Sequence, residues 1–298
     1  MNKKLRAKVI DILLLAMIIL PFVACMVLRI LTRGASEGIS ITGAQVYFTV
    51  PMPLMDLIIS ESQVVSCAVM IALLGLCLFL THGIAVIPNS KRQLAAEWIV
   101  EKVKGLVDNN MGDRFHVFAP FVTAIMGLSV FSSLSSLLGL YPPTSDVNIL
   151  LGWAILVFIL ITYYKLKGGL WNYVKGFFQP IPFFAPLNVI GEIATPISMS
   201  FRHYGNVLSG AVISTLIAAA LQGLSRMLLG WLPGILGEIP FLRIGIPAIL
   251  SMYFDVFSGC LQAFIFAMLT MLNISNGFPE EDYERRMAKR REKALHRA

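Results

Sequence analysis

The chain has 298 residues, of which 57% are hydrophobic and 14% are charged, and its formal net charge is +7. Average soluble proteins contain about 25% charged residues, and several apolar stretches here are long enough to cross a hydrocarbon layer about 30 Å thick. The composition excludes a soluble enzyme, a secreted disulfide scaffold and a disordered protein. It predicts an all-α polytopic membrane protein.

The distribution of positive charge indicates how the chain is threaded through the membrane. Most Lys and Arg residues gather in four segments, 3–8, 91–114, 165–175 and 285–297, which alternate with connections that contain few of them. Loops rich in Lys and Arg stay in the cytoplasm. The net charge is therefore a topology signal, and no nucleic-acid partner is expected.

The first half of the chain is expected to cross the membrane three times, at residues 10–31, 62–87 and 115–140. The Pro-punctuated residues 32–61 between the first two crossings are interpreted as an external loop. Residues 89–114 place apolar side chains at helical spacing opposite charged ones. This pattern is typical of an amphipathic helix lying on the cytoplasmic surface.

The second half adds three apolar segments, at residues 148–164, 187–228 and about 246–275. A cytoplasmic turn rich in Gly and aromatic residues follows the first, and an external loop with Pro233 and Pro240 joins the last two. Six crossings in total, about one per apolar segment, place both termini in the cytoplasm, in agreement with their basic charge.

The fifth segment is too long for an upright span. Its 42 residues, 187–228, would extend about 60 Å at 1.5 Å per residue, roughly twice the hydrocarbon thickness. The last two segments are therefore predicted to form a long hairpin that is strongly tilted or bent.

We divide the chain into an extra N-terminal span with its external loop (1–44), a membrane domain (45–276) and a basic cytoplasmic tail (277–298). A basic start followed by an apolar core is also typical of a cleaved signal peptide, and FVAC at 22–25 weakly resembles a lipoprotein cleavage site. Retention is favoured because Phe22 fits such a site poorly. The N-terminus is cytoplasmic only if this span is retained.

Three charged residues lie well inside the last two apolar segments: Glu192, Arg202 and Asp255. Ionisable residues within a membrane are rare and are functional hypotheses by default. Arg202 is far from either end of its segment and cannot easily reach an interface. At 100° per residue, it shares one helix face with small or polar residues, namely Gly191, Thr195, Ser198, Gly205, Asn206 and Ser209. Without the arginine this face would be interpreted as a helix-packing seam; with it, a functional site is favoured.

The last segment has a matching polar face, composed of Ser251, Asp255, Ser258, Gly259 and Gln262, which Thr270 and Asn273 extend toward the cytoplasm. Asp255 and Gln262 are seven residues apart, which is two turns of a regular helix. A neutral, hydrogen-bonded core aspartate is the alternative for Asp255.

No metal site or cofactor is expected. The four cysteines lie in apolar stretches without CxxC spacing, and no two histidines have the spacing of metal ligands. His203 follows Arg202 but points about 100° away, so it is interpreted as a packing or interface residue. Because P-loop, GxSxG and HExxH motifs are absent from the sequence, the chain is expected not to be an enzyme on its own.

Two stretches resemble the hallmarks of subunit a of the F-type ATP synthase, the stator half of its ion channel. They are PISMSFRHYGNVLSG at 196–210 and LQAFIF at 261–266. PTSDVN at 143–148 and NSKRQLAAEW at 89–98 resemble further conserved regions of that family. The resemblance covers about residues 45–275.

The resemblance implies a subunit of a rotary ATP synthase in a bacterial-type plasma membrane, with both termini cytoplasmic. It implies as partners the ring of c subunits, the b subunits of the peripheral stalk and the rest of the complex. Arg202 would be the essential stator arginine, Asn206 would line the ion path and Gln262 would pack beside the arginine. Two positions depart from the family pattern: Ala211 stands where members often have glutamate, and Asp255 where many have His or Glu.

The mechanism that this implies has two offset half-channels beside a tilted hairpin that faces the rotor ring. Ions, either H⁺ or Na⁺, would enter along an outer path involving Asp146, Asn148, Asp255 and Asn206, and neutralise a rotor carboxylate. They would leave through a cytoplasmic path lined by Glu192, Thr195 and Ser198, and Arg202 would separate the two paths. The alternative is a secondary transporter that uses Arg202 to bind an anionic substrate. Such proteins typically show two related halves with broken helices, and no repeat is visible in this sequence.

Overall fold

The computed structural model describes residues 3–295 apart from 33–42, 54–55, 89, 180 and 230–244. Within these ranges six helical segments are long and apolar enough to cross a membrane. They are Leu5–Thr32, Glu61–Thr81, Asp113–Leu138, Val147–Leu166, Pro182–Leu229 and Met252–Gly277. This confirms the predicted all-α polytopic fold. The expected external loop at 226–243 lies mostly outside the described residues.

The elements follow one another along the chain with short connections. The N-terminal part contains α1 (Lys3–Thr32), β1 (Val46–Val50), β2 (Leu57–Ser60), α2 (Glu61–Thr81) and α3 (Lys91–Met111). The middle contains η1 (Asp113–Phe118), α4 (Ala119–Leu134), η2 (Ser135–Leu138), η3 (Pro143–Ser145), α5 (Val147–Leu166), α6 (Leu170–Phe177) and η4 (Pro182–Phe184). The C-terminal part contains α7 (Ala185–Leu229), α9 (Ile246–Ser251), the π-helix η6 (Met252–Ser258), α10 (Gly259–Gly277) and α11 (Glu280–Leu295).

The region expected to be an external loop contains a small antiparallel hairpin formed by β1 and β2. Val46 pairs with Ser60 and Val50 pairs with Leu57. The sequences VYFTV and LIIS are rich in β-branched and aromatic residues, which favour strands. The mixed composition of residues 32–61 concealed these two short runs, so no strand was predicted there.

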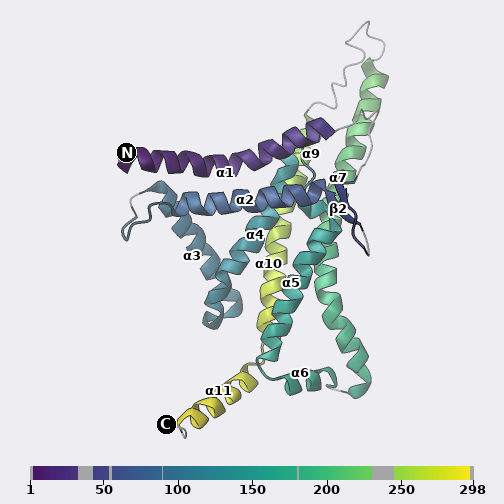
Figure 1. Ribbon diagram of the computed structural model, residues 1–298. Helices are drawn as coiled ribbons and strands as arrows, with labels where there is room; N and C mark the ends of the chain where they lie inside the picture. Colours follow the sequence, from purple (N-terminus) through teal and green to yellow (C-terminus); the bar gives the residue numbers. More distant parts are fainter. Residues whose placement is uncertain are drawn as a thin grey trace.

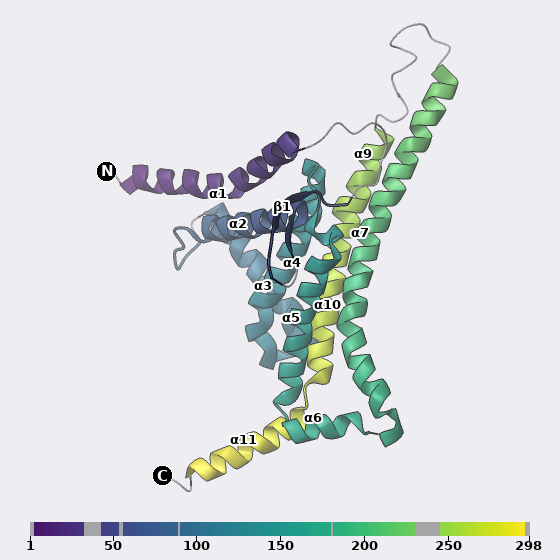
Figure 2. The same cartoon turned by 45° about the vertical axis from the view of Figure 1, so that its right-hand side comes forward.

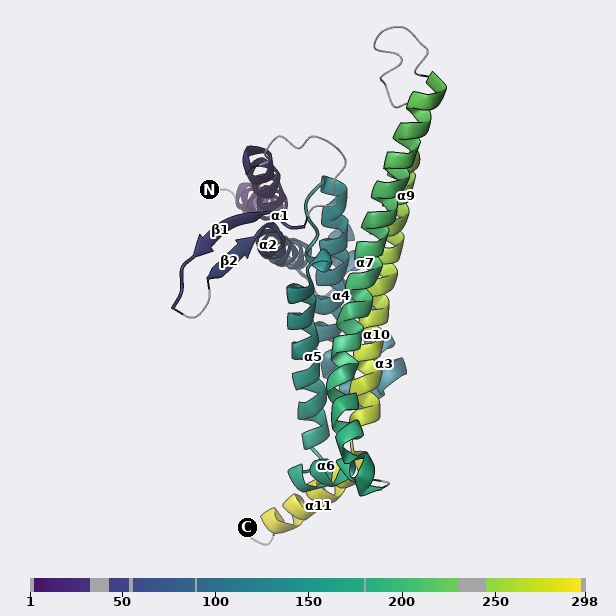
Figure 3. The same cartoon turned by 90° about the vertical axis from the view of Figure 1, so that its right-hand side faces the viewer.

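Two sets of spans cross at a steep angle. Helices α1 and α2 pack side by side and lie across the bundle formed by α4, α5, α7 and α10 (Figure 1). After a quarter turn, α1 and α2 are seen nearly end-on while the other four helices run lengthwise (Figure 3). The two sets therefore cannot both stand upright in one membrane. With α1 and α2 upright, the hairpin of α7 and α10 is strongly tilted, as its length predicted.

The main core lies where α3, α4, α5 and α10 meet. Its fully buried members include Val107, Val122, Val157 and Ala267. Because lipid tails are as apolar as these side chains, the core gains stability in the membrane from close van der Waals packing rather than from removal of surface from water.

The long hairpin packs closely because glycines lie at its contacts. Helix α7 has 45 residues and runs alongside α9, η6 and α10 (Figure 2). A Cβ atom at Gly210 would lie 3.0 Å from Phe254 Cδ1 in η6, and one at Gly259 would lie 2.6 Å from Ser133 Cβ in α4. Small residues at these points allow the backbones of α7, η6 and α4 to approach one another.

The amphipathic helix expected at 89–114 is α3, which begins after Ser90, whose hydroxyl accepts a hydrogen bond from the Gln93 backbone. Arg92 of α3 forms a bidentate pair with Asp11 of α1, with distances of 2.8 and 3.0 Å. The predicted cytoplasmic turn contains the short helix α6, and the tail contains α11. Neither helix was predicted from the sequence.

Candidate functional site

The polar residues of α7 lie on an outward face of the helix. Ser198, Arg202, Asn206 and Ser209 are all exposed, at the spacing expected for one side of a helix. We call these four residues the polar face. Within the described part of the chain, no acidic side chain forms an ion pair with Arg202. The chain therefore leaves this guanidinium available to another molecule.

The neighbouring His203 points into the protein. Its side chain is fully buried, with ring centroids 6.4 Å from Trp153 and 6.0 Å from Phe266. Its Nε2 lies 3.4 Å from the hydroxyl of Ser129 in α4. His203 is therefore a packing residue, and the predicted divergence of Arg202 and His203 is present in the structure.

A hydrogen bond joins the polar face to the last span. Asn206 Nδ2 donates to Gln262 Oε1 at 2.7 Å, and Gln262 is buried in α10. Asn206 follows Arg202 by one helical turn, so the Asn206–Gln262 pair lies next to the arginine along the helix. The two motifs, 65 residues apart at their start points, thus meet at this bond.

Asp255 lies in a segment that is not a regular α-helix. Residues 252–258 form the π-helix η6, which has more residues per turn than an α-helix. The 100° spacing that placed Asp255 and Gln262 on one face therefore does not apply across η6. Asp255 instead lines a small cavity together with Ser133, Pro142, Val207, Phe254 and Gly259. π-Helical turns occur frequently at functional sites.

Asp146 and Asn148 lie at the start of α5, and Asp146 has a clear structural role. Its Oδ1 accepts a hydrogen bond from the Asn148 backbone at 2.9 Å and so caps the helix. Its Oδ2 accepts a hydrogen bond from the hydroxyl of Ser62. Pro142 of the same connection borders the Asp255 cavity. The structure thus brings this connection, rather than Asp146 alone, to the cavity.

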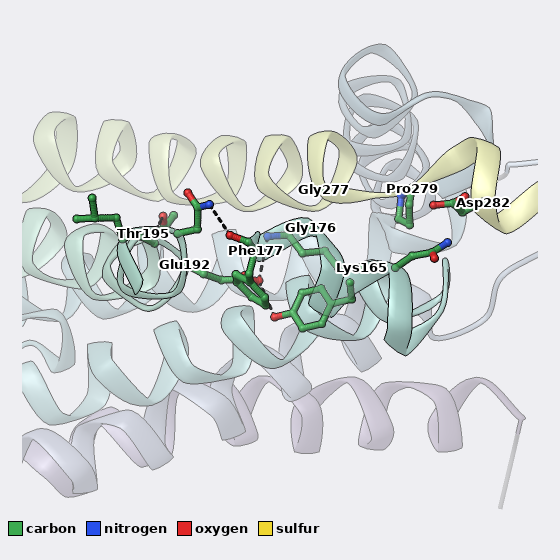
Figure 4. A pocket seen from close by; sticks show the side chains of 13 residues that line it. Lys165, Gly176, Phe177, Glu192, Thr195, Gly277, Pro279 and Asp282 are labelled. Atoms are coloured by element: carbon green, nitrogen blue, oxygen red, sulfur yellow. Dashed lines mark hydrogen bonds and ion pairs between the residues drawn. The ribbon is translucent and has the colours of Figure 1, made fainter. Parts of the chain in front are cut away.

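A larger hollow lies at the beginning of α7. Its volume is about 530 Å³, and Glu192, Thr195, Lys165 and Tyr173 line it, together with residues near the start of α11 (Figure 4). Glu192 Oε1 accepts hydrogen bonds from Lys165 Nζ at 2.9 Å and from the Tyr173 hydroxyl at 3.0 Å. Ser198, predicted beside Glu192 and Thr195, lies outside this hollow on the polar face.

Lys165 and Tyr173 are members of this hollow that were not singled out in the sequence. Burial and the nearby Glu192 carboxylate raise the pKa of Tyr173 to about 12, so its hydroxyl remains a hydrogen-bond donor. A lysine at the end of a span and an aromatic-rich turn were the available signals. Both were interpreted only as topology features, because their distance in sequence from Glu192 conceals the contact.

Comparison with known proteins identifies the family. A family model described as ATP synthase A chain matches residues 63–275. The chain belongs to the ATP synthase subunit a family. The subunit a of Listeria welshimeri is 31% identical over 229 residues, covering 73% of this chain and 90% of the relative. Those of Anoxybacillus flavithermus and Priestia megaterium are 32% and 34% identical over 207 residues, covering 66% of this chain and 82% of each relative.

The family match includes every candidate site residue, from Asp146 to Gln262, but neither terminal helix. Helix α1 ends before residue 63 and α11 begins after residue 275. These two helices are therefore features of this chain beyond the region that defines the subunit a family.

Proposed function

We propose that this chain is the ion-translocating stator subunit of a rotary F-type ATP synthase. The observation that supports this is the outward position of Arg202, midway along a long tilted helix and without an ion-pair partner in the described chain. A guanidinium facing lipid costs several kcal/mol, on the order of 3 on insertion scales. A membrane carboxylate on a neighbouring rotor subunit would remove that cost.

The two hollows lie on opposite sides of Arg202 along α7. Thr195 borders the larger hollow and precedes Arg202 by seven residues, about 10 Å along the helix axis. Val207 borders the Asp255 cavity and follows Arg202 by five residues, about 8 Å. This offset supports two half-channels that each reach the polar face at a different height.

In the outer half-channel, ions pass from the 139–146 connection to Asp255 and then to the Asn206–Gln262 pair. There they neutralise a rotor carboxylate, which then moves into the lipid. After nearly a full turn of the ring, the ion leaves beside Thr195 and Glu192. Asp255, the titratable group of the outer cavity, relays the ion, and Asp146 holds the mouth of the path in shape. The ion is H⁺ or Na⁺, according to the binding site of the ring.

Arg202 has two tasks in this scheme. Its fixed positive charge favours the ionised form of an approaching rotor carboxylate and so promotes release of the ion. It also repels cations that would pass directly between the half-channels. Arginine suits both tasks because it stays protonated even when desolvated, whereas a buried lysine can lose its proton. Each charge supplies about 2.3 kcal/mol per 100 mV, so many ions must be added by rotation to drive synthesis of one ATP.

Nucleotide chemistry takes place on other chains in this proposal, and the chain works within the plasma membrane. Its partners are the c-subunit ring, which faces the polar face, the b subunits of the peripheral stalk and the rest of the complex.

The contacts between α1, α2 and α3 support a cytoplasmic location for both termini. Asp11 lies within 3.5 Å of His82 Nδ1 and pairs with Arg92, and all three belong to segments with a predicted cytoplasmic end. A reporter fused after Ala298 should accordingly be cytoplasmic. An external reporter would overturn the topology and with it the order of the two half-channels.

The deciding experiment uses Arg202→Ala in the whole complex reconstituted into vesicles, with Arg226→Ala as control. Arg226 is an exposed arginine in the last turn of the same helix. Arg202→Ala should abolish ion-driven ATP synthesis and allow a passive ion leak, whereas Arg226→Ala should retain synthesis. ATP synthesis at the wild-type rate by Arg202→Ala would overturn the proposal. Arginine-dependent uptake of an anionic solute by the chain without its partners would favour a secondary transporter instead.

A further inference from the structure

The N-terminal helix α1, outside the family match, provides a cation for a buried carboxylate of α2. Glu61 is the first residue of α2, and its side chain is 2% exposed. Arg29 Nη1 lies 3.2 Å from Glu61 Oε1. A buried carboxylate without a positive partner is strongly unfavourable. The stability of Glu61 in its ionised form therefore depends on α1.

The same two side chains hold the connection between α4 and α5. Arg29 Nη1 donates to the backbone carbonyl of Gly139, and the Tyr141 backbone N–H donates to Glu61 Oε1 at 3.1 Å. Beside Glu61, the hydroxyl of Ser62 donates to Asp146. The ends of α1 and α2 thus bind both the beginning and the end of this connection.

The connection is part of the outer path in the proposed mechanism. Pro142 borders the cavity that contains Asp255, and Asp146 caps α5. We infer that Arg29 and Glu61 form a positioning pair that holds residues 139–146 at the mouth of the outer half-channel. This inference rests on the proposed function, because the outer half-channel is part of that proposal.

The inference requires that α1 remain attached after synthesis. A second observation supports retention of this span. Cys25, where a lipoprotein-type cleavage would occur, is 5% exposed and belongs to a buried cluster with Val65 and Val69 of α2. Leu140 of the same connection completes that cluster. Helix α1 is therefore packed into the protein beside the Arg29–Glu61 pair and functions as a permanent part of the subunit.

The test uses the complete ATP synthase in vesicles, with Arg29→Met, Glu61→Gln and the double variant. Arg29→Met should shift the dependence of ATP synthesis on the external ion concentration by about tenfold, because it leaves a buried charge unpaired. The dependence on ADP should not change. In the double variant no charge is left unpaired, and the amide oxygen introduced by Glu61→Gln can still accept from the Tyr141 backbone. The double variant should therefore lie much closer to the wild type than Arg29→Met does.

Arg92→Met is the matched control, since Arg92 also pairs with an acid across α1, but far from the 139–146 connection. It should leave the external ion dependence unchanged. An unchanged ion dependence in Arg29→Met, or a double variant no better than Arg29→Met in assembly or activity, would overturn the inference. So would a mature subunit whose mass lacks residues 1–24. These outcomes are independent of Arg202→Ala, which tests the proposed function itself.

Discussion

The outward and inward faces of α7 treat their polar groups in opposite ways. On the inward face, His203 is fully buried between aromatic rings and lies within reach of the Ser129 hydroxyl. On the outward face, one residue earlier, Arg202 is exposed and forms no ion pair with any described residue. A helix buried in its own protein satisfies its polar groups there. The exposed guanidinium therefore indicates a partner outside the chain.

The Arg29–Glu61 pair extends this contrast to a second site. There a buried carboxylate meets its guanidinium within the same chain, at 3.2 Å. An internally neutralised pair positions backbone, whereas a charge left on an outer face is available for chemistry with another subunit. The comparison predicts different consequences for substitutions on the two faces of α7.

The largest effect is expected for Arg202→Lys, which retains the charge but not the chemistry. An ammonium group lacks the planar donor fork and can lose its proton when desolvated. ATP synthesis by the reconstituted complex should fall close to background, while ATP hydrolysis by the soluble sector continues. Synthesis at the wild-type rate would show that the outward face needs only a positive charge.

The second effect concerns Asp255 in the cavity behind the polar face. Asp255→Asn should lower ion-driven ATP synthesis several-fold without loss of assembly, because the amide cannot bind and release a proton. Asp255→Glu and Asp255→His should retain more activity, since both side chains can titrate. Equal activity of the Asn and Glu variants would return Asp255 to a purely structural role.

The third effect separates the two faces through glycine. Gly210→Ala on the inward face would place a Cβ 3.0 Å from Phe254, whereas a Cβ at Gly205 meets nothing within 4 Å. Gly210→Ala should therefore destabilise the purified subunit by about 1–3 kcal/mol, measured by thermal unfolding in detergent. Gly205→Ala should leave this stability unchanged. If the ring packs closely against the polar face, Gly205→Ala should lower ATP synthesis in the complex.

The smallest effect is expected for His203→Leu. The His203 Nδ1 atom is buried without a hydrogen-bond partner among the described residues, so its removal relieves a desolvation cost while the apolar volume is roughly kept. ATP synthesis should remain near the wild-type rate, and stability should change by less than about 1.5 kcal/mol. A loss comparable to that of Arg202→Lys would show that the inward face participates in ion transfer.

The sequence alone determined the spans, the length of the hairpin and its need to tilt. These features follow from local hydropathy and from the rise per residue of a helix, which do not depend on contacts with the rest of the chain. The divergence of Arg202 and His203 also followed from helical periodicity. The family could be inferred from the arginine motif, since its residues are contiguous.

Only the tertiary structure decided which groups meet across the chain. Arg29 meets Glu61, and Lys165 meets Glu192 across 27 residues; one sequence contains no signal that pairs them. The same holds for Asp255, because η6 departs from the regular helix on which periodicity depends. Charge pairs and cavities arise from the packing of separate helices, and packing is a property of the whole fold rather than of any one segment.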